Sequence, residues 1–275
     1  MVNSIPFLWS GRSSPTSAIR HHNNHPVTTL HHHNNPHVNT INLRPIPKSP
    51  TPISKQKSLK ITLFSTRSLN NKSLILNEFI TDNKLDLLCL TKTWQKPLDY
   101  LSLNQTTPAG YSYMDNPRSE GRGGGIAVIH RQDLNPRPLS IPAAPSSAHL
   151  AFKIPGPKPL VIAIIYRPPK PNPSFLSDLS EFITQLSSIS PSILLLGNFN
   201  IHIDSPDCKS AIEFLDILNC FNFTQHVNFP THSRGHIVDL VCSTGLHIRN
   251  LSSIDLTISD YLAIILDIGK WSAFI

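Results

Sequence analysis

Short apolar runs, each bounded by polar or turn-forming residues, recur from residue 60 onward and constrain the fold more than any other feature. Runs of this length without a helical period are typical of buried β-strands. About eight such strands are predicted, at 60–64, 86–91, 126–130, 149–154, 160–166, 193–196, 237–241 and 263–268. The longest uninterrupted apolar run, 160–165, is far shorter than the ~18 residues that a membrane span needs, so no membrane partner is expected.

Three further segments have the apolar period of amphipathic helices. Asn70 and Asn71 can cap the first, at 72–82, and Asn172-Pro173 suits the N-cap and first helical position of the second. The third spans 208–219. The residues expected to share one helix face are Ile75, Leu76, Phe79 and Ile80 in the first helix and Phe175, Leu179, Phe182, Ile183 and Leu186 in the second. Because several strands follow one another without a helix between them, we predict one domain of two stacked sheets covered by helices.

The excess positive charge is confined to the start of the chain. Residues 1–60 hold seven of the 24 Lys and Arg and none of the 17 Asp and Glu, so the formal charge of +7 belongs to them. The segment is rich in Ser, Pro and Asn, and half of the 14 His lie within 21–37. Such a composition cannot bury enough apolar surface to offset its ordering entropy. We predict a disordered basic tail at 1–58, a folded domain at 59–268 and a short C-terminal tail at 269–275.

Two other interpretations of the basic tail stay open. A histidine tract can bind metal weakly, and transit peptides share its lack of acidic residues, although it has no amphipathic stripe. No secretory signal is visible, and no CxxC pair occurs among the cysteines, which are Cys89, Cys208, Cys220 and Cys242. Neither a disulfide scaffold nor a zinc ribbon is therefore expected. Reduced thiols favour an intracellular protein, with nucleus or cytoplasm left open.

Polar residues stand at the ends of the predicted strands, where a rigid sheet can aim a reactive side chain. They are Ser65, Lys92, Tyr166, Asn198, Asn200, Asp239, Asp260 and Tyr261. Asp239 is flanked by Val238, Leu240 and Val241, so its carboxylate needs a buried partner. The run 123–125 lacks the Lys-Ser/Thr ending of a phosphate loop and is predicted to enter a hairpin. His202, His226, His232 and His236 lack metal-ligand spacing on one element and are assigned to the surface and loops.

The order of seven motifs around these residues resembles the endonuclease/exonuclease/phosphatase superfamily. The motifs are LFSTRSL (63–69), LCLTKTW (88–94), GRGGGIAV (121–128), IIYRPP (164–169), LLLGNFN (194–200), VDLV (238–241) and SDYLAI (259–264). More narrowly, they are similar to the apurinic-type endonuclease domain of LINE-type (non-LTR) retrotransposons. The resemblance implies an α/β, DNase I-like fold, a four-layer αββα sandwich that hydrolyses phosphodiesters with a divalent cation, usually Mg²⁺.

The resemblance also implies roles for individual residues. Four match the family pattern and would be catalytic, namely Tyr166, Asn200, Asp239 and Asp260, and Thr231 matches a phosphate-contacting threonine. Four other catalytic positions are substituted. Ser65 stands where the family has Asn, and Lys92 stands where it has a metal-binding Glu. Asn198 replaces the water-activating Asp, and Tyr261 replaces the His that pairs with an Asp; the implied partner of Asp239 is therefore Tyr261 or a backbone group.

Each substitution opposes the family's chemistry. Lys92 is a donor-only cation at the ancestral ligand position and repels magnesium. Asn198 cannot accept a proton from water, and Tyr261 carries no positive charge at neutral pH. Ser65 is shorter than Asn and has no carbonyl oxygen. No intact metal site is expected, so Mg²⁺ is predicted to be absent here although the family uses it.

These observations favour a degenerate retrotransposon-type endonuclease domain, ancestrally a DNA-nicking hydrolase and catalytically inactive in this chain. One alternative is an active phosphodiesterase whose site has been rebuilt around Asp260, Asp239 and Asn200. A second is a non-catalytic nucleic-acid-binding module, and a third is a translated relic without a selected function. DNA is expected to bind weakly and mainly through the basic tail, because the domain itself has balanced charge. A monomer is expected.

Overall fold

The computed structural model describes residues 57–118, 123–142, 145–156 and 158–271. The predicted basic tail lies outside this part of the chain, except for its last two residues. Lys57 opens the first strand, and Lys57 pairs with Trp271 at the end of the last strand. Strand β1 thus starts two residues before the predicted limit of 59, and β12 includes 269–271, because these residues continue an antiparallel strand pair.

Two six-stranded mixed sheets form the centre of the fold. The first sheet has the order β11 (Ile248–Ile254), β12 (Ala263–Trp271), β1 (Lys57–Ser65), β2 (Leu87–Thr91), β4 (Ile126–Arg131) and β3 (Tyr111–Asn116). The second has the order β5 (Arg137–Pro138), β6 (Ala148–Ile154), β7 (Leu160–Tyr166), β8 (Ile193–Asn198), β10 (Asp239–Thr244) and β9 (Thr224–Gln225). In each sheet one parallel pair, β1–β2 or β7–β8, is joined by a helix, and the other neighbours are antiparallel.

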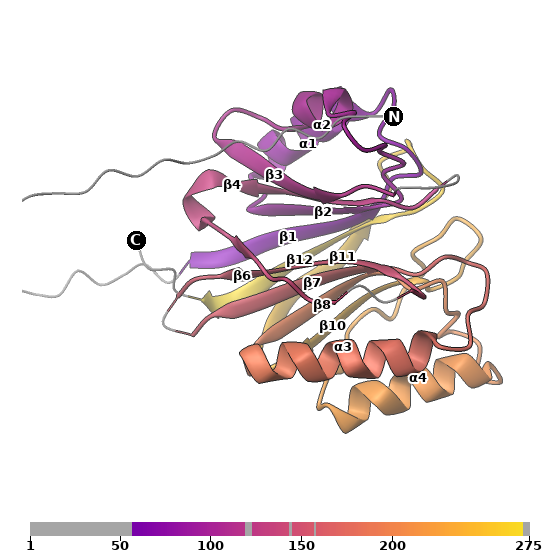
Figure 1. The fold of residues 1–275 in the computed structure, drawn as a ribbon. Coiled ribbons are helices and arrows are strands. Elements are labelled where there is room, and N and C mark those ends of the chain that lie inside the picture. The colour runs from indigo at the N-terminus through magenta and orange to yellow at the C-terminus, as the bar shows by residue number, and fades with distance from the viewer. Residues whose placement is uncertain (1–56, 119–122, 143–144, 157, 272–275) are drawn as a thin grey trace, which may run out of the picture. The chain divides into compact units, whose positions relative to one another are not determined.

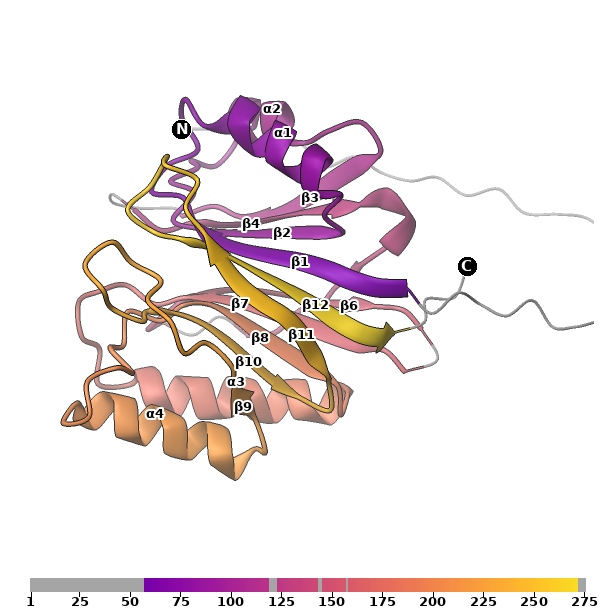
Figure 2. The same ribbon diagram turned by 180° about the vertical axis from the view of Figure 1, so that it is seen from behind.

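Helices cover the outer faces of both sheets. Helices α1 (Ser73–Asn83) and α2 (Leu101–Thr106) lie on the first sheet, and α3 (Phe175–Ile189) and α4 (Lys209–Cys220) lie on the second (Figures 1 and 2). A single turn of 3-10 helix, Gln132–Leu134, follows β4. The predicted four-layer αββα sandwich is confirmed. None of the helices in the described ranges is long and apolar enough to cross a membrane.

Strand β7 shows why these residues form a sandwich. All seven of its residues are buried. Ile162 and Ile164 point into the core between the two sheets, whereas Val161, Ala163 and Ile165 pack against the helices on the other face. Successive side chains of a strand point to opposite faces of the sheet. A strand with both faces covered therefore needs a continuous apolar run, which is the pattern in the sequence.

The ends of the helices differ from the sequence predictions. Helix α1 begins at Ser73, and its N-cap, Lys72, makes no capping hydrogen bond, so Asn70 and Asn71 do not cap it. Helix α3 begins at Phe175, because the side chain of Asn172 accepts the backbone N–H of Ser174 and completes a turn before the helix. These Asn side chains favour turns as well as caps, so the sequence placed both helix starts too early.

One residue of the predicted face of α1 lies elsewhere. Ile75 is 44% exposed, whereas Leu76, Phe79 and Ile80 are buried. The sequence also missed β3, β5, β9, β11 and α2. Strands β3 and β11 are edge strands with partly exposed faces and polar residues, so neither contains the apolar run by which the other strands were predicted.

Two other predictions concern the turns and the thiols. The run 123–125 enters β4, which forms an antiparallel pair with β3, and this confirms a hairpin entry. Gly124 and Gly125 have φ of +83° and +82°, and their carbonyl oxygens accept the backbone N–H groups of Trp94 and Thr93.

All four cysteines are free thiols, and burial raises the pKa of Cys89 and Cys242.

Candidate active site

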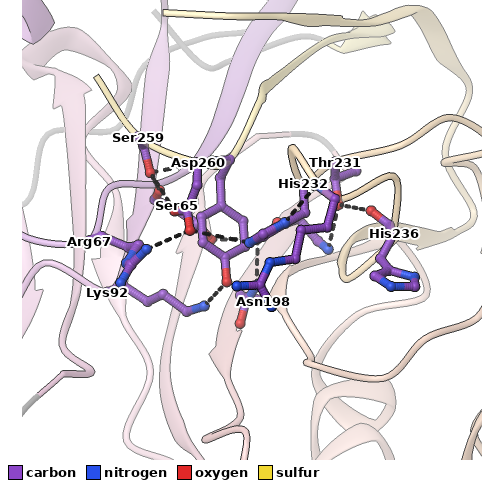
Figure 3. A network of polar contacts seen from close by, with 12 residues as sticks. Ser65, Arg67, Lys92, Asn198, Thr231, His232, His236, Ser259 and Asp260 are labelled. Atoms are coloured by element: carbon purple, nitrogen blue, oxygen red, sulfur yellow. Dashed lines mark hydrogen bonds and ion pairs between the residues drawn. The ribbon is translucent and has the colours of Figure 1, made fainter. Parts of the chain in front are cut away.

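The carboxyl ends of the two parallel pairs bring the polar strand ends together. Ser65 ends β1 beside Thr91 at the end of β2, and Tyr166 ends β7 beside Asn198 at the end of β8. Asp239 begins β10 directly opposite Asn198. Because the two sheets are stacked, polar residues from both of them meet at one edge of the sandwich (Figure 3).

Asp239 is the buried centre of this cluster. Only 1% of its surface is exposed, and its Oδ1 accepts hydrogen bonds from Ser65 Oγ at 2.5 Å and from Asn198 Nδ2 at 3.0 Å. Burial raises the pKa of Asp239 to about 6, although these hydrogen bonds and the charge of Lys92 act in the opposite direction. The expected partner, Tyr261 or a backbone group, is therefore corrected: the partners of the carboxylate are the side chains of Ser65 and Asn198.

Lys92 and Tyr261 form the second part of the cluster. Lys92 Nζ donates a hydrogen bond to Tyr261 Oη and lies 4.1 Å from the centroid of that ring. The ammonium is also 6.0 Å from the ring centroid of Tyr166. Burial lowers the pKa of Lys92 to about 8, opposed by the charges of Asp239 and Asp260, so the side chain is mainly protonated at neutral pH. Burial also raises the pKa of Tyr261, which stays neutral.

Asp260 forms the rim of the cluster. Its Oδ2 lies 2.5 Å from Arg67 Nη1 and 3.3 Å from His232 Nε2. Although partial burial acts in the opposite direction, Arg67 holds the pKa of Asp260 below its usual value. The ring of His232 packs at 90° against Tyr261 with centroids 4.6 Å apart, and burial lowers the pKa of His232. His232 was predicted to lie in a loop without this contact, because the two segments meet through tertiary backbone pairing, which includes the bridge between His232 and Tyr261.

Two predicted site residues make other contacts. Asn200 Nδ2 donates to the backbone oxygen of Arg167 at 2.5 Å and joins the loops after β7 and β8. Thr231 is fully buried, and its Oγ1 accepts the backbone N–H groups of Val238 and Asp239 at 3.0 and 3.1 Å. Thr231 thus fixes the backbone that presents Asp239.

Tyr166 borders an open pocket next to the cluster. The pocket has a volume of about 310 Å³, and its lining includes Arg118, Gly124 and Pro168. A Cβ at Gly124 would lie 3.3 Å from Tyr166 Cε1 and 2.9 Å from Arg118 Cδ, so this wall requires a glycine. The pocket has a phenol, a guanidinium side chain and backbone groups at its border, which suits a phosphate-bearing ligand.

The donor set at the centre does not suit magnesium. Mg²⁺ requires several oxygen ligands in near-octahedral geometry, with carboxylates to balance its charge. Asp239 Oδ2 and Asn198 Oδ1 are buried acceptors without a hydrogen-bond donor among the described residues. They are one carboxylate oxygen and one amide oxygen, and the ammonium of Lys92 is attracted to the same carboxylate. A divalent cation there would have to displace Lys92 against electrostatic repulsion.

Comparisons with known proteins agree with this fold. Residues 62–260 match the model of the endonuclease/exonuclease/phosphatase family. Among solved structures, the AP endonuclease LMAP from Leishmania major is 16% identical with a TM-score of 0.63, over 78% of this chain and 88% of that one. The endonuclease domain of TRAS1, a telomere-specific non-LTR retrotransposon, is 11% identical with a TM-score of 0.62, over 78% and 99%.

An AP endonuclease from Archaeoglobus fulgidus is 18% identical with a TM-score of 0.60, over 76% of this chain and 98% of that one. No curated protein sequence matches the chain. At these identities the solved structures show the fold alone, whereas the family model spans most of the sequence. The family typically uses Mg²⁺. With two stacked mixed sheets between helices and a family match that runs from β1 to the rim residue Asp260, this chain belongs to the endonuclease/exonuclease/phosphatase family.

Proposed function

We propose that this chain is a retrotransposon-type endonuclease domain that has lost metal-dependent phosphodiester hydrolysis. The observation that carries the proposal is the pairing among the substituted positions. Lys92 donates to Tyr261, while Ser65 and Asn198 donate to Asp239. The buried carboxylate is thus stabilised by hydrogen bonds and a lysine ammonium, in a cluster that needs no metal ion for charge balance.

Three groups that hydrolysis requires are missing from this arrangement: a base for the attacking water, a cation for the oxyanion and a ligand for a metal. The amide of Asn198 cannot take a proton from an attacking water. Tyr261 is neutral, since its pKa is raised, and it cannot offer a cation to the developing oxyanion. Lys92 offers a fixed positive charge, but it provides no ligand for a metal. Loss of one such electrostatic group commonly costs about 10²–10³ in rate, so the combined losses leave hydrolysis near the background rate.

The test is to restore the family residues in the full chain. We expect Ser65→Asn, Lys92→Glu, Asn198→Asp and Tyr261→His together to create Mg²⁺-dependent nicking of supercoiled plasmid. Lys92→Glu alone should create magnesium binding with little turnover, because water still lacks its activating Asp. Lys84→Glu is the matched control, since it makes the same charge change at an exposed residue after α1. It should leave metal binding unchanged.

Two outcomes would contradict the proposal. A folded quadruple variant that stays inert with Mg²⁺ and with Mn²⁺ would mean that these are not the positions at which activity was lost. Mg²⁺-dependent nicking by the unaltered chain would mean that activity was never lost. A cooperative thermal transition of both proteins must be established first, so that inactivity is not confused with unfolding.

An active phosphodiesterase with a rebuilt site is the second candidate, and the contact between His232 and Asp260 favours it. This pair places an imidazole 3.3 Å from a carboxylate at the rim, although Tyr261 occupies the family's His position. If this pair supports hydrolysis, the unaltered chain should nick plasmid DNA, and His232→Ala and Asp260→Ala should each abolish the activity. His226→Ala, which changes a half-buried His bonded to Ser243 instead, should not.

DNA binding by a monomeric intracellular protein is the remaining part of the proposal. The excess positive charge lies in the first 60 residues, so counterion release from this segment should dominate affinity for duplex DNA. A chain lacking 1–56 keeps β1 intact and loses five of those seven cations. We expect its DNA affinity to fall, and the slope of its salt dependence to flatten by up to about 0.9 for each phosphate that these cations neutralise. Unchanged binding would place the DNA-binding surface on the folded domain instead, as a binding module requires.

A further inference from the structure

Two histidines and an aspartate outside the cluster around Asp239 lie together on neighbouring loops. His202 and Asp204 belong to the loop after β8, and His236 belongs to the loop before β10. One possible ligand atom of each residue lies within 4.8 Å of those of the other two. Nothing in the sequence indicates this group, because the three residues share no element and their spacing predicts no site.

Strand pairing explains why the two loops meet. The strands β8 and β10 are antiparallel neighbours, so the end of one lies beside the start of the other. The backbone N–H of Phe199 continues this pairing by donating to Val238 O at 2.9 Å. The loop of His236 is closed by its own backbone, since the N–H of Thr231 donates to His236 O at 3.0 Å. Both loops are therefore held in place by the sheet.

The three side chains contact one another. Asp204 Oδ1 accepts the backbone N–H of Ile237 at 3.0 Å, and Asp204 Oδ2 lies 3.0 Å from His236 Nδ1. The ring of His202 packs edge-on against that of His236, with centroids 4.2 Å apart. The carboxylate is thus anchored at one oxygen by the backbone of Ile237.

We propose that His202, Asp204 and His236 bind one Zn²⁺ ion. Two imidazoles and one carboxylate form a donor set that zinc takes in proteins, and magnesium does not favour imidazole. With zinc bonds of about 2.0–2.1 Å, the donors of a tetrahedral site stand about 3.3 Å apart. The separation of Asp204 Oδ2 from His236 Nδ1 is 3.0 Å, and the ligand atom of His202 lies within 4.8 Å of both, so side-chain rotations would have to complete the site. His236 presents Nδ1 and keeps its proton on Nε2, so two bonds to the metal replace the hydrogen bond to Asp204 Oδ2.

The exposure of the group fits a metal that enters from solvent. The side chains of His236 and Asp204 are 42% and 26% exposed, so no buried path is required. Three protein ligands leave a fourth position for water or a phosphate oxygen. A bound ion would also tie together the loops that extend from Asn198 and Asp239, which links this site mechanically to the ends of β8 and β10.

The test is metal binding, and it is independent of any hydrolysis. The full chain is used with the seven histidines of 21–37 replaced by asparagine, because that tract would bind zinc by itself. We expect isothermal titration to show one Zn²⁺ per chain with micromolar or tighter affinity. Co²⁺ in its place should give the visible absorption of a tetrahedral site. The paired substitution His202→Ala with His236→Ala should remove both signals.

Two further variants keep the test decisive. Asp204→Asn retains an oxygen for the N–H of Ile237 and removes the anionic ligand, so zinc affinity should fall at least tenfold while the metal-free chain still unfolds in one cooperative transition. His247→Ala removes an exposed histidine elsewhere and should leave zinc binding as it was. Zinc affinity no tighter than millimolar, or tight binding that survives all changes at 202, 204 and 236, would overturn the proposal.

Discussion

The interior between the two sheets and the polar cluster at their edge differ in the kind of contact that holds them together. The interior is apolar, and strands such as β7 alternate between the sheet–sheet core and the helix-covered face. At the edge, a few polar and charged side chains are held by hydrogen bonds, with Ser65 and Asn198 donating to Asp239 and Lys92 donating to Tyr261. A fold specified by many interchangeable apolar contacts tolerates change that a site of a few charged groups does not.

The cluster satisfies its buried polar groups only in part. Asp239 Oδ1 accepts two hydrogen bonds and Lys92 provides a cation nearby, whereas Asp239 Oδ2 and Asn198 Oδ1 have no hydrogen-bond donor among the described residues. The comparison therefore predicts that truncation of the interior should be costly under all conditions. Changes in the cluster should depend on pH and on the state of the neighbouring charge.

The largest effect on stability should come from the interior. Phe152 is fully buried between the sheets, and Phe152→Ala should lower the free energy of unfolding by about 3–5 kcal/mol, through reduced apolar burial and an unfilled cavity. Leu98 is 83% exposed, so Leu98→Ala should change the free energy of unfolding by no more than about 0.5 kcal/mol. Urea unfolding measures the free energy for both variants. A loss below about 1 kcal/mol for Phe152→Ala would show that the sheets are not closely packed there.

The next effect is a pH dependence caused by Asp239. Its pKa near 6 in the folded state lies above the ordinary value of 3.8, so the folded state binds this proton more tightly. Stability from this group should therefore rise as the pH falls from about 6 to about 4, by up to about 3 kcal/mol. Asp204 and Asp260 act in the opposite sense, because their pKa values are lowered and their contribution is lost in acid.

The difference between the parent and Asp239→Asn isolates this contribution. Urea unfolding of both proteins at several values of pH from about 4 to about 8 should show that the parent gains stability relative to the variant as the pH falls. The exposed Asp82→Asn serves as a control and should run parallel to the parent. Parallel curves for Asp239→Asn as well would mean that Asp239 is not desolvated.

Much of the fold could be predicted from the sequence, because buried strands carry their signal in their own residues. The runs that became β1, β2, β4, β6, β7, β8, β10 and β12 are apolar over most of their length. The edge strands β3 and β11 are not, and only their pairing with β4 and β12 makes them strands. Their existence depends on tertiary neighbours, which a local pattern does not record.

The site was predicted as a set of positions but not as a set of contacts. The resemblance indicated that Ser65, Lys92, Asn198 and Tyr261 are substituted, and it implied Tyr261 or a backbone group as the partner of Asp239. Instead, Asp239 accepts hydrogen bonds from Ser65 and Asn198, and Tyr261 accepts one from Lys92. The pair of Ser65 and Asp239 joins the two sheets, so it follows from their stacking. Lys92 and Tyr261 adjoin two strands of the first sheet that are far apart in the sequence, so their contact follows from the order of the strands. The group of His202, Asp204 and His236 is of the same kind, since only the β8–β10 pairing brings it together.

A smaller effect tests whether Lys92 and Asp239 act as a pair. At pH 7, Lys92→Met leaves the ionised Asp239 without its nearby cation and should destabilise the fold by about 1–2 kcal/mol. In the Asp239→Asn background the same change removes a costly desolvated ammonium and should be neutral or stabilising. Urea unfolding of the four proteins gives the coupling between the two sites. Equal effects of Lys92→Met in both backgrounds would mean that the ammonium does not stabilise the carboxylate.

The smallest effect should come from the rim. Arg67 and Asp260 are joined at 2.5 Å, but their side chains are 51% and 28% exposed, so water screens the pair. Arg67→Ala should therefore cost less than about 1 kcal/mol of stability, and less still at high salt. It should also let the pKa of Asp260 rise toward its ordinary value, as NMR titration of the carboxyl can show, whereas the exposed Arg137→Ala should not. A stability loss comparable to that of Phe152→Ala would contradict the contrast between interior and edge, because it would make a solvated ion pair as important to the fold as the sheet–sheet core.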